Sequence, residues 1–163
     1  MPRTPTPQPT LAVFLDIGDT LAAAVVHAGH LAALQVYPFV PEVLRRLRNG
    51  PGEASVAVGL ISDTGHETAQ HLAEVLAASG LADLVDASLC LFSSVEGLDK
   101  SRPELFSLAA ARAGLSAARC LYVGEDAAER GVAAVAGFAT SPHPLHALHL
   151  VESQALSPQH AHP

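Results

Sequence analysis

Short apolar runs alternate with helix-like segments along most of this chain, and no other feature of the sequence constrains its fold as strongly. The expected strands cover residues 11–15, 55–62, 84–92, 120–124 and 138–140. The expected helices cover residues 41–50, 65–80, 103–115 and 129–138. This alternation is typical of parallel sheets with helices on both faces. The sequence therefore predicts an α/β protein built on a three-layer αβα, Rossmann-like parallel sheet.

Proline, glycine and threonine mark the ends of the expected helices. Pro41 and Pro103 stand where a first helical turn tolerates proline, and Gly50 and Gly80 stand where a helix commonly stops. Thr64 has the side chain of an N-cap and is expected to begin the helix over 65–80.

The length of 163 residues suits one domain, flanked by two segments of different composition. Residues 1–10 are rich in Pro and Thr and are predicted to be a disordered leader. Residues 11–144 form the predicted domain, with a small flap at 22–39, and residues 145–163 form a predicted C-terminal tail. His143, His146 and His149 are assigned to this solvated tail rather than to a metal site, since no set of carboxylates surrounds them.

Charge and hydropathy narrow the classes of partner. The formal charge is −7, and the positive residues form no basic stripe, so nucleic-acid binding is not expected. No run approaches the roughly 20 apolar residues of a membrane span, and the N-terminus has no signal-peptide pattern. We therefore expect a soluble, cytoplasmic protein with no membrane partner.

Polar residues follow three of the expected strands directly. Asp16 ends the first, Ser62 ends the second, and Gly124, Glu125 and Asp126 follow the run at 120–124. In an open parallel sheet the carboxyl ends of the strands meet in one crevice, where ligands bind. We expect the functional site of this chain there.

The segment around Asp16, LAVFLDIGDTL, resembles the first motif of the haloacid dehalogenase-like hydrolase superfamily, an apolar strand followed by Asp-x-Asp-Gly-Thr-Leu. The resemblance spans about residues 11 to 144. It implies that Asp16 is the nucleophile, forming an aspartyl-phosphate, and that Thr20 lies in the substrate site. Gly18 replaces the second Asp of the motif, the usual acid–base group. The resemblance leaves the Gly18 carbonyl as a metal ligand and the Asp19 side chain pointing elsewhere.

Three further motifs occur in the order that this resemblance requires. In VGLISDTG, Ser62 and Asp63 match the residues that bind phosphoryl oxygens. In DKSRPELF, Lys100 matches the lysine that neutralises phosphoryl charge and keeps the nucleophile ionised. In LYVGEDAAERGVAAVAGF, Glu125 and Glu129 match the two acids, so that Asp16, Gly18, Glu125 and Glu129 would hold Mg²⁺. Asp126 is a rival ligand.

The spacing of the motifs leaves no room for a large cap domain. Asp16 and Ser62 are only 46 positions apart, and Ser62 and Lys100 only 38. By resemblance, capless members act on large substrates or cover their site with another subunit. The substrate is therefore expected to be a phosphorylated small molecule or a larger phosphorylated one. The apolar flap at 22–39 favours a contact with a second copy or a partner protein.

These patterns predict a Mg²⁺-dependent phosphomonoester hydrolase and leave two alternatives open. Gly18 and the Glu replacements favour a catalytically weak or inactive binding subunit of the same fold. A metal-independent haloacid-type dehalogenase also uses an Asp nucleophile and dispenses with the second Asp, although the missing cap argues against it. If the chain is a phosphatase, His27 or His30 in the flap is a candidate substitute for the missing acid–base group.

Overall fold

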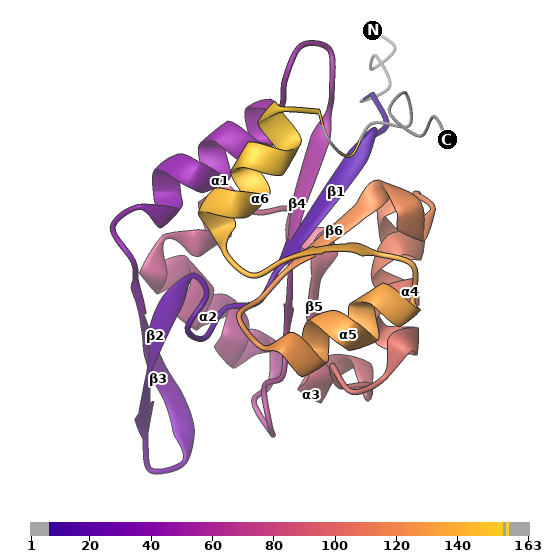
Figure 1. The fold of residues 1–163 in the computed structure, drawn as a ribbon. Coiled ribbons are helices and arrows are strands. Elements are labelled where there is room, and N and C mark those ends of the chain that lie inside the picture. Colours follow the sequence, from indigo (N-terminus) through magenta and orange to yellow (C-terminus); the bar gives the residue numbers. More distant parts are fainter. Residues whose placement is uncertain (1–6, 155, 157–163) are drawn as a thin grey trace, which may run out of the picture.

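The computed structural model describes residues 7–154 and 156 and has the predicted three-layer architecture (Figure 1). Its central sheet has five parallel strands in the order β5-β4-β1-β6-β7. They are β1 (Leu11–Leu15), β4 (Val56–Ser62), β5 (Cys90–Phe92), β6 (Cys120–Val123) and β7 (Ala139–Ser141). The Rossmann-like α/β prediction is confirmed.

Helices cover both faces of the sheet because successive strand residues point to opposite sides. Val13 and Leu15 of β1 pack in one core with α1 (Val40–Asn49), α2 (Ala69–Ser79) and α6 (Pro144–Glu152). Ala12 and Phe14 pack in the other core with α4 (Pro103–Ala113) and α5 (Ala127–Val135). The short α3 (Ser93–Glu96) follows β5, and η3 (Ala117–Arg119) precedes β6.

The strand register brings the predicted site residues to one edge. Leu15, the last residue of β1, pairs with Leu60 of β4 and with Val123 of β6. Asp16 therefore follows β1 beside the end of β4, where Ser62 lies, and beside Gly124 after β6. This is the common carboxyl edge that the sequence predicts.

The expected strand at 84–92 is mostly wrong, because only Cys90–Phe92 is a strand. The preceding residues form two 3₁₀ turns, η1 (Leu81–Leu84) and η2 (Ala87–Leu89). Between them, Asp86 takes the place of a strand residue. Its carboxylate accepts a hydrogen bond from the backbone N–H of Val58 at 2.9 Å, and its own N–H donates to the Val58 carbonyl at 2.8 Å.

Helix α2 begins later than expected, at Ala69 rather than at residue 65. Its N-cap is Thr68, whose hydroxyl accepts a hydrogen bond from His71 N–H at 3.1 Å. Thr64, the predicted cap, instead bonds to Ser93 and Ser94. Those bonds hold the loop after β4 against α3.

The prediction of a C-terminal tail from residue 145 is wrong over residues 145–152, which belong to α6 (Pro144–Glu152). Its apolar face, Ala147, Leu148 and Val151, is buried beside α1. The histidines assigned to the tail have structural roles here: His143 caps α6 by accepting a hydrogen bond from Leu145 N–H, and His146 bonds to Ser141. The rest of the predicted tail, apart from residues 153, 154 and 156, lies outside the described residues, as do residues 1–6 of the predicted leader.

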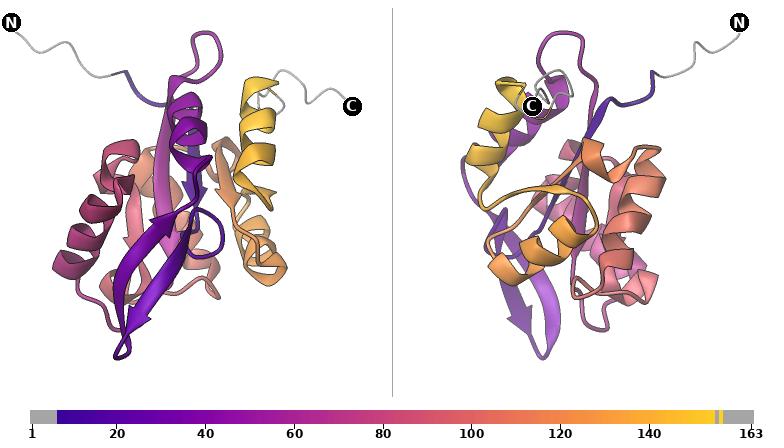
Figure 2. Two further views of the ribbon diagram at one scale, coloured as in Figure 1. Left: turned by 90° about the vertical axis from the view of Figure 1, so that its left-hand side faces the viewer. Right: turned by 45° about the vertical axis from the view of Figure 1, so that its right-hand side comes forward.

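The predicted flap is an antiparallel hairpin of β2 (Ala22–His27) and β3 (His30–Val36). It projects past the carboxyl edge of the sheet (Figure 2). It is the only insertion between β1 and α1, all of which the structure describes, so the prediction of no large cap is confirmed. Val26 at its tip is 62% exposed, and contact of this flap with another chain stays a prediction. Among the described residues, no helix has the length and apolar character needed to cross a bilayer.

Candidate active site

Asp16 lies directly after β1, almost fully buried, at the carboxyl edge of the sheet. Its backbone N–H donates to the Val123 carbonyl at 2.9 Å, which continues the sheet by one residue. Its Oδ1 accepts a hydrogen bond from Ile17 N–H at 2.8 Å and lies 2.9 Å from the Lys100 ammonium. These contacts engage one carboxylate oxygen and leave the other, Oδ2, for a ligand.

The loop after Asp16 turns sharply back into the hairpin. The N–H groups of Leu21 and Ala22 both donate to the Ile17 carbonyl, and Asp19 adopts a left-handed φ of 60°. The Asp19 side chain is exposed, as expected, and so does not replace the acid that Gly18 lacks. The hydroxyl Oγ1 of Thr20 is buried with no hydrogen-bond partner among the described residues, so this predicted substrate-site residue has an unused polar atom.

Lys100 is the only lysine of the chain, and it is 4% exposed. Its Nζ lies 2.9 Å from Asp16 Oδ1 and 2.9 Å from Glu129 Oε2. Its backbone N–H donates to Asp63 Oδ1 at 3.0 Å, which fixes the segment just before α4. A buried lysine between two acids is costly to desolvate unless it is well paired, and this pairing satisfies it.

Burial and charge act in opposite directions on these groups. Burial raises the pKa of Asp16 above its ordinary value, and the Lys100 ammonium only partly offsets that rise. Burial alone would lower the pKa of Lys100, but Asp16 and Glu129 outweigh it, so that the pKa of Lys100 lies above its ordinary value. Lys100 is therefore a permanent cation at neutral pH, facing an Asp16 carboxyl that is harder to ionise than that of a surface aspartate.

Two residues that the sequence analysis did not assign to the site support it from β6 and α5. The hydroxyl of Tyr122, fully buried under the sheet edge, donates to Glu129 Oε2 at 3.2 Å. Arg130 donates to the carbonyls of Gly124 and Glu125 at 2.8 and 2.6 Å and so holds the loop after β6. Tyr122 is the one polar side chain in a buried apolar strand, and this is the signal that identifies it in retrospect.

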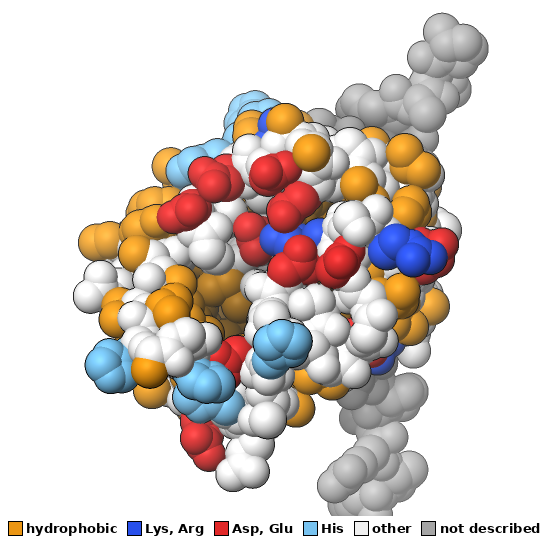
Figure 3. Space-filling model, turned by 90° about the horizontal axis from the view of Figure 1, so that it is seen from below, with side chains coloured by type: hydrophobic (Ala, Val, Ile, Leu, Met, Phe, Trp, Pro, Cys, Tyr) orange, Lys and Arg blue, Asp and Glu red, His pale blue; other side chains and the backbone are white. Residues whose placement is uncertain are grey.

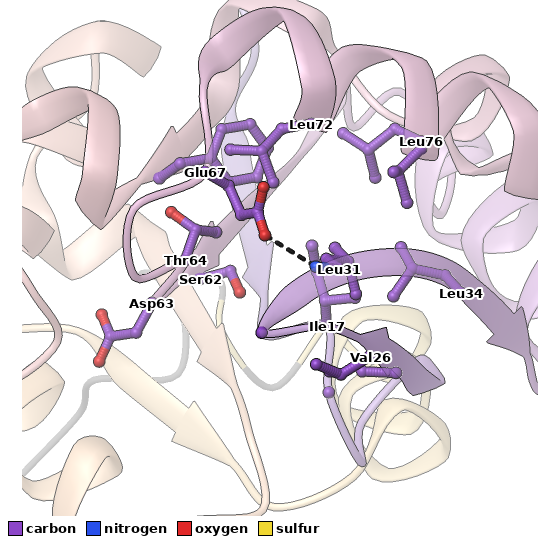
Figure 4. Close-up of a pocket in the computed structure, with 15 residues that line it drawn as sticks. Ile17, Val26, Leu31, Leu34, Ser62, Asp63, Thr64, Glu67, Leu72 and Leu76 are labelled. Atoms are coloured by element: carbon purple, nitrogen blue, oxygen red, sulfur yellow. Dashed lines mark hydrogen bonds between the residues drawn. The ribbon is translucent and has the colours of Figure 1, made fainter.

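Ser62 and Asp63, the two residues predicted to bind phosphoryl oxygens, have different surroundings in the structure. Ser62 is 8% exposed, and its side chain points into a cavity beside the loop after β1 (Figure 4). Asp63 instead accepts a hydrogen bond from the Lys100 backbone N–H with one of its carboxylate oxygens. Ser62 is thus available to a ligand, whereas Asp63 positions the lysine.

The candidate metal ligands supply oxygen atoms only, which suits Mg²⁺. Glu125 is exposed, and Glu129 has its Oε2 engaged by Lys100 and Tyr122. Asp126, the rival ligand, caps α5 by accepting the Glu129 N–H at 2.9 Å. Within residues 7–154 and 156, no three His, Cys, Asp or Glu side chains converge as a metal group. Mg²⁺ in proteins commonly binds one or two carboxylates together with water and substrate oxygens. Asp16, the Gly18 carbonyl and Glu125 therefore offer the type of ligand atom that Mg²⁺ requires.

The face that carries this site is strongly acidic (Figure 3). Asp and Glu side chains gather around positively charged ones, and an apolar hollow lies beside them with histidines near its rim. Asp16, Glu129 and Lys100 together carry one net negative charge, since two carboxylates meet one ammonium.

The model of the haloacid dehalogenase-like hydrolase family matches residues 10–137, which is most of the chain and includes every site residue described above. The chain belongs to the haloacid dehalogenase-like hydrolases. The comparison with curated proteins gave no match.

Solved structures of similar fold cover this hydrolase to different extents. A protein described as a dehalogenase is 26% identical with a TM-score of 0.56; the match covers 66% of this chain and 44% of that one. An L-2-haloacid dehalogenase is 23% identical with a TM-score of 0.59, covering 74% of this chain and 58% of that one. A haloacid dehalogenase-superfamily hydrolase of subfamily IA from Geobacter sulfurreducens is 14% identical with a TM-score of 0.63, covering 86% and 98%. The chain thus spans less than half the length of the first of these relatives.

Proposed function

We propose that this hydrolase is a Mg²⁺-dependent phosphomonoesterase in which Asp16 accepts the phosphoryl group. The observation that supports this most strongly is the Asp16 carboxylate itself. One of its oxygens is fixed by the Ile17 N–H and the Lys100 ammonium, and the other takes part in neither contact. A carboxylate held in this way has a defined direction of attack.

The reaction divides into two displacements at phosphorus. In the first, Oδ2 of Asp16 attacks, and the bond from phosphorus to the ester oxygen breaks. The leaving oxygen keeps the bonding electrons and takes a proton from water. In the second, water attacks phosphorus and loses a proton to solvent. The bond between phosphorus and Asp16 breaks, which frees orthophosphate and restores the carboxylate.

Ser62 and Lys100 are the residues proposed to stabilise the phosphoryl group. The Ser62 side chain points into the cavity beside the loop that follows Asp16 (Figure 4), and in this proposal its hydroxyl donates to a non-bridging oxygen. The Lys100 ammonium carries a fixed charge next to the attacking carboxylate. Preorganised donors of this kind stabilise charge that develops in the transition state.

The charge of the site supports a requirement for a cation. Asp16, Lys100 and Glu129 sum to one negative charge, and Glu125 and Asp126 are exposed on the loop beside them. A phosphomonoester dianion is repelled from such a surface. Bound at Asp16, the Gly18 carbonyl and Glu125, Mg²⁺ would supply the positive charge that draws in the phosphate and polarises it.

The absence of a side chain at Gly18 limits which leaving groups the enzyme is expected to release rapidly. No side chain at this position can protonate the leaving oxygen or activate water. His30 in the flap does not take over this role in our proposal, since its Nδ1 lies 3.4 Å from Glu67. The enzyme should therefore prefer leaving groups that need no proton, such as phenols, over alcohols.

A panel of aryl and alkyl phosphates, assayed with and without Mg²⁺, tests the proposal. We expect Mg²⁺-dependent release of phosphate, fastest from aryl esters, and its loss in Asp16→Asn. Asp19→Asn, an exposed neighbour in the same loop, is the matched control and should keep its activity. Equal turnover by Asp16→Asn would overturn the proposal. A folded protein with no activity on any ester would support the inactive-subunit alternative.

A metal-independent dehalogenase is the second candidate, because a solved structure that is 26% identical is described as a dehalogenase and because Gly18 leaves no acid–base group. In that reaction Asp16 would attack the carbon that bears the halogen, and halide would leave with the bonding electrons. Chloride release from 2-chloropropionate in the presence of a chelator, without phosphatase activity, would decide for this candidate.

A further inference from the structure

An apolar cavity of about 260 Å³ lies between the hairpin and α2, immediately beside the loop that follows Asp16. Its walls come from the hairpin, from α2, from the loops after β1 and β4, and from the end of β5 (Figure 4). The apolar walls are formed by Ile17, Ala24, Val26, Leu31, Leu34, Leu72, Val75, Leu76 and Phe92. Gly18, Ser62, Asp63 and Thr64 line the end that adjoins the loops after β1 and β4. The cavity is thus continuous with the phosphoryl site and has a different chemical character.

Two hydrogen bonds from α2 and the residues before it hold the hairpin over the cavity. Glu67 accepts the Leu31 N–H at 2.7 Å, and the His71 Nε2–H donates to the Leu31 carbonyl at 2.6 Å. Both backbone groups of one residue of β3 are thereby fixed to the opposite wall. The cavity is therefore formed before any ligand arrives, which lowers the cost of binding.

The register of the hairpin separates cavity-facing residues from those on the other side. Ala24 pairs with Leu34 and Val26 pairs with Leu31, and all four line the cavity. Val25 pairs with Ala33, and neither of them lines it. One face of the hairpin therefore lines the cavity and the other faces away. Ala24 and Val26 alternate along β2, whereas Leu31 and Leu34 share this face of β3 because the register shifts between the Val25 and Val26 pairs.

We infer that this cavity binds the leaving group of the substrate, and that the substrate is a phosphomonoester with an uncharged apolar body about the size of one aromatic ring. This inference rests on the proposed function for the position of the phosphoryl group at Asp16. A cavity of about 150 Å³ lined by apolar side chains is enough to take benzene, so this one accommodates a ring and the atom that links it to phosphorus. A sugar or a polyol would leave without partners those of its hydroxyl groups that face the leucine and valine side chains, away from Ser62, Asp63, Thr64 and Glu67.

Glu67 restricts the charge of the group that the cavity can bind. Its side chain is 11% exposed in the wall of the cavity, and its carboxylate is ionised at neutral pH because the Leu31 N–H lowers its pKa. A second anionic group on the substrate would be repelled there. A neutral ring meets no such penalty.

Binding of two non-hydrolysable phosphonates to the wild-type protein, measured by calorimetry with Mg²⁺ present, tests the inference without requiring turnover. Benzylphosphonate should bind about tenfold more tightly than methylphosphonate, the gain expected from burying the ring. 4-Carboxybenzylphosphonate should lose that gain. Equal affinity for benzylphosphonate and methylphosphonate would overturn the cavity assignment, and full affinity for the carboxylated ligand would overturn its charge selectivity.

Two alanines of the hairpin provide matched variants. Ala24→Leu fills the cavity from an exposed position and should abolish the preference for benzylphosphonate over methylphosphonate. Ala33→Leu adds the same side chain on the opposite face and should leave both affinities unchanged. An equal effect of the two variants on the preference would contradict the assignment.

These outcomes separate the inference from the proposed function. A protein that prefers benzylphosphonate but hydrolyses no phosphate ester keeps the cavity assignment and loses the proposed function. A protein that hydrolyses phosphate esters but shows no preference for the aromatic phosphonate keeps the function and loses the cavity assignment.

Discussion

Lys100 and Asp16 form an ion pair at 2.9 Å in which both side chains are almost completely buried. Lys100 is the only lysine in 163 residues, and its backbone is fixed by Asp63. A buried ion pair is a poor source of stability, because desolvating two charges costs about as much as their attraction returns. The pair is better understood as part of the proposed catalytic site.

Lys100→Met should lower kcat/KM for an aryl phosphate by about 100- to 1000-fold, as the loss of one preorganised electrostatic contact does in other sites. The variant leaves Asp16 and Glu129 without their shared cation. Arg102→Met, which removes an exposed cation two residues away, is the control and should change kcat/KM little. Comparable losses in the two variants would show that Lys100 acts only through the overall charge.

The pH dependence of kcat/KM should reflect the raised pKa of Asp16. Asp16 attacks as a carboxylate, so the rate falls as pH decreases through its pKa in the free enzyme. Because burial raises that pKa in the metal-free site, the acid limb measured at limiting Mg²⁺ should lie above 3.8, the ordinary value for aspartate. The pKa of Lys100 is raised above 10.5, so this residue contributes no loss of rate below that pH. An acid limb at or below 3.8 would contradict this account of the site.

Gly18→Asp should increase the hydrolysis of alkyl phosphates, because it restores a group that can donate and accept a proton. A side chain fits there: a Cβ added to Gly18 meets no atom within 4 Å, and its φ is not positive. General acid–base catalysis contributes about 10²- to 10⁴-fold. Gly18→Asn, of the same size but without the acid, is the control. If Asp and Asn give the same rates, proton transfer does not limit this enzyme.

Glu125 and Glu129 should differ in their effects on the metal. Glu125 is exposed, whereas Glu129 contacts Lys100 and Tyr122. Glu125→Gln should raise the Mg²⁺ concentration for half-maximal activity roughly tenfold, in the range that altered metal sites show. Glu129→Gln should lower kcat with a smaller effect on that concentration. A Mg²⁺ titration of both variants distinguishes these roles, and the reverse pattern would assign the metal to Glu129.

The sequence predicts the fold where burial alone decides it. The run at 11–15 becomes β1 with the predicted bounds, because its residues are apolar on both faces and Asp16 ends it. The prediction fails at 84–92. There Asp86 makes two hydrogen bonds to Val58, with its carboxylate and its backbone N–H, in place of a regular strand pairing. It also fails at α6, whose histidines look like a solvated tail until the helix is packed against α1.

For the site, the sequence predicts the residues whose position follows from a strand end. Asp16 and Ser62, which follow or end strands, lie at the same edge of the sheet as predicted. Lys100, which only the motif resemblance indicated, reaches Asp16 from the segment before α4. The contacts among side chains were not predictable: Glu129 pairs with Lys100 rather than with Arg130, and Arg130 holds the carbonyls of the loop after β6. These depend on how α5 is rotated against β6, which no local pattern encodes. The cavity under the hairpin depends in the same way on the position of the hairpin against α2.

Phosphorylation of Asp16 is tested most directly by acid-quenching the enzyme during turnover of an aryl phosphate with Mg²⁺ and analysing its peptides by mass spectrometry. Gly18 provides no base for the attacking water, so the first displacement should outpace the second and the phosphoryl-enzyme should accumulate. We predict one phosphoryl group on the peptide that contains Asp16, and none in Asp16→Asn. Steady turnover with the Asp16 peptide unmodified, or with the phosphoryl group on another residue, would contradict the account.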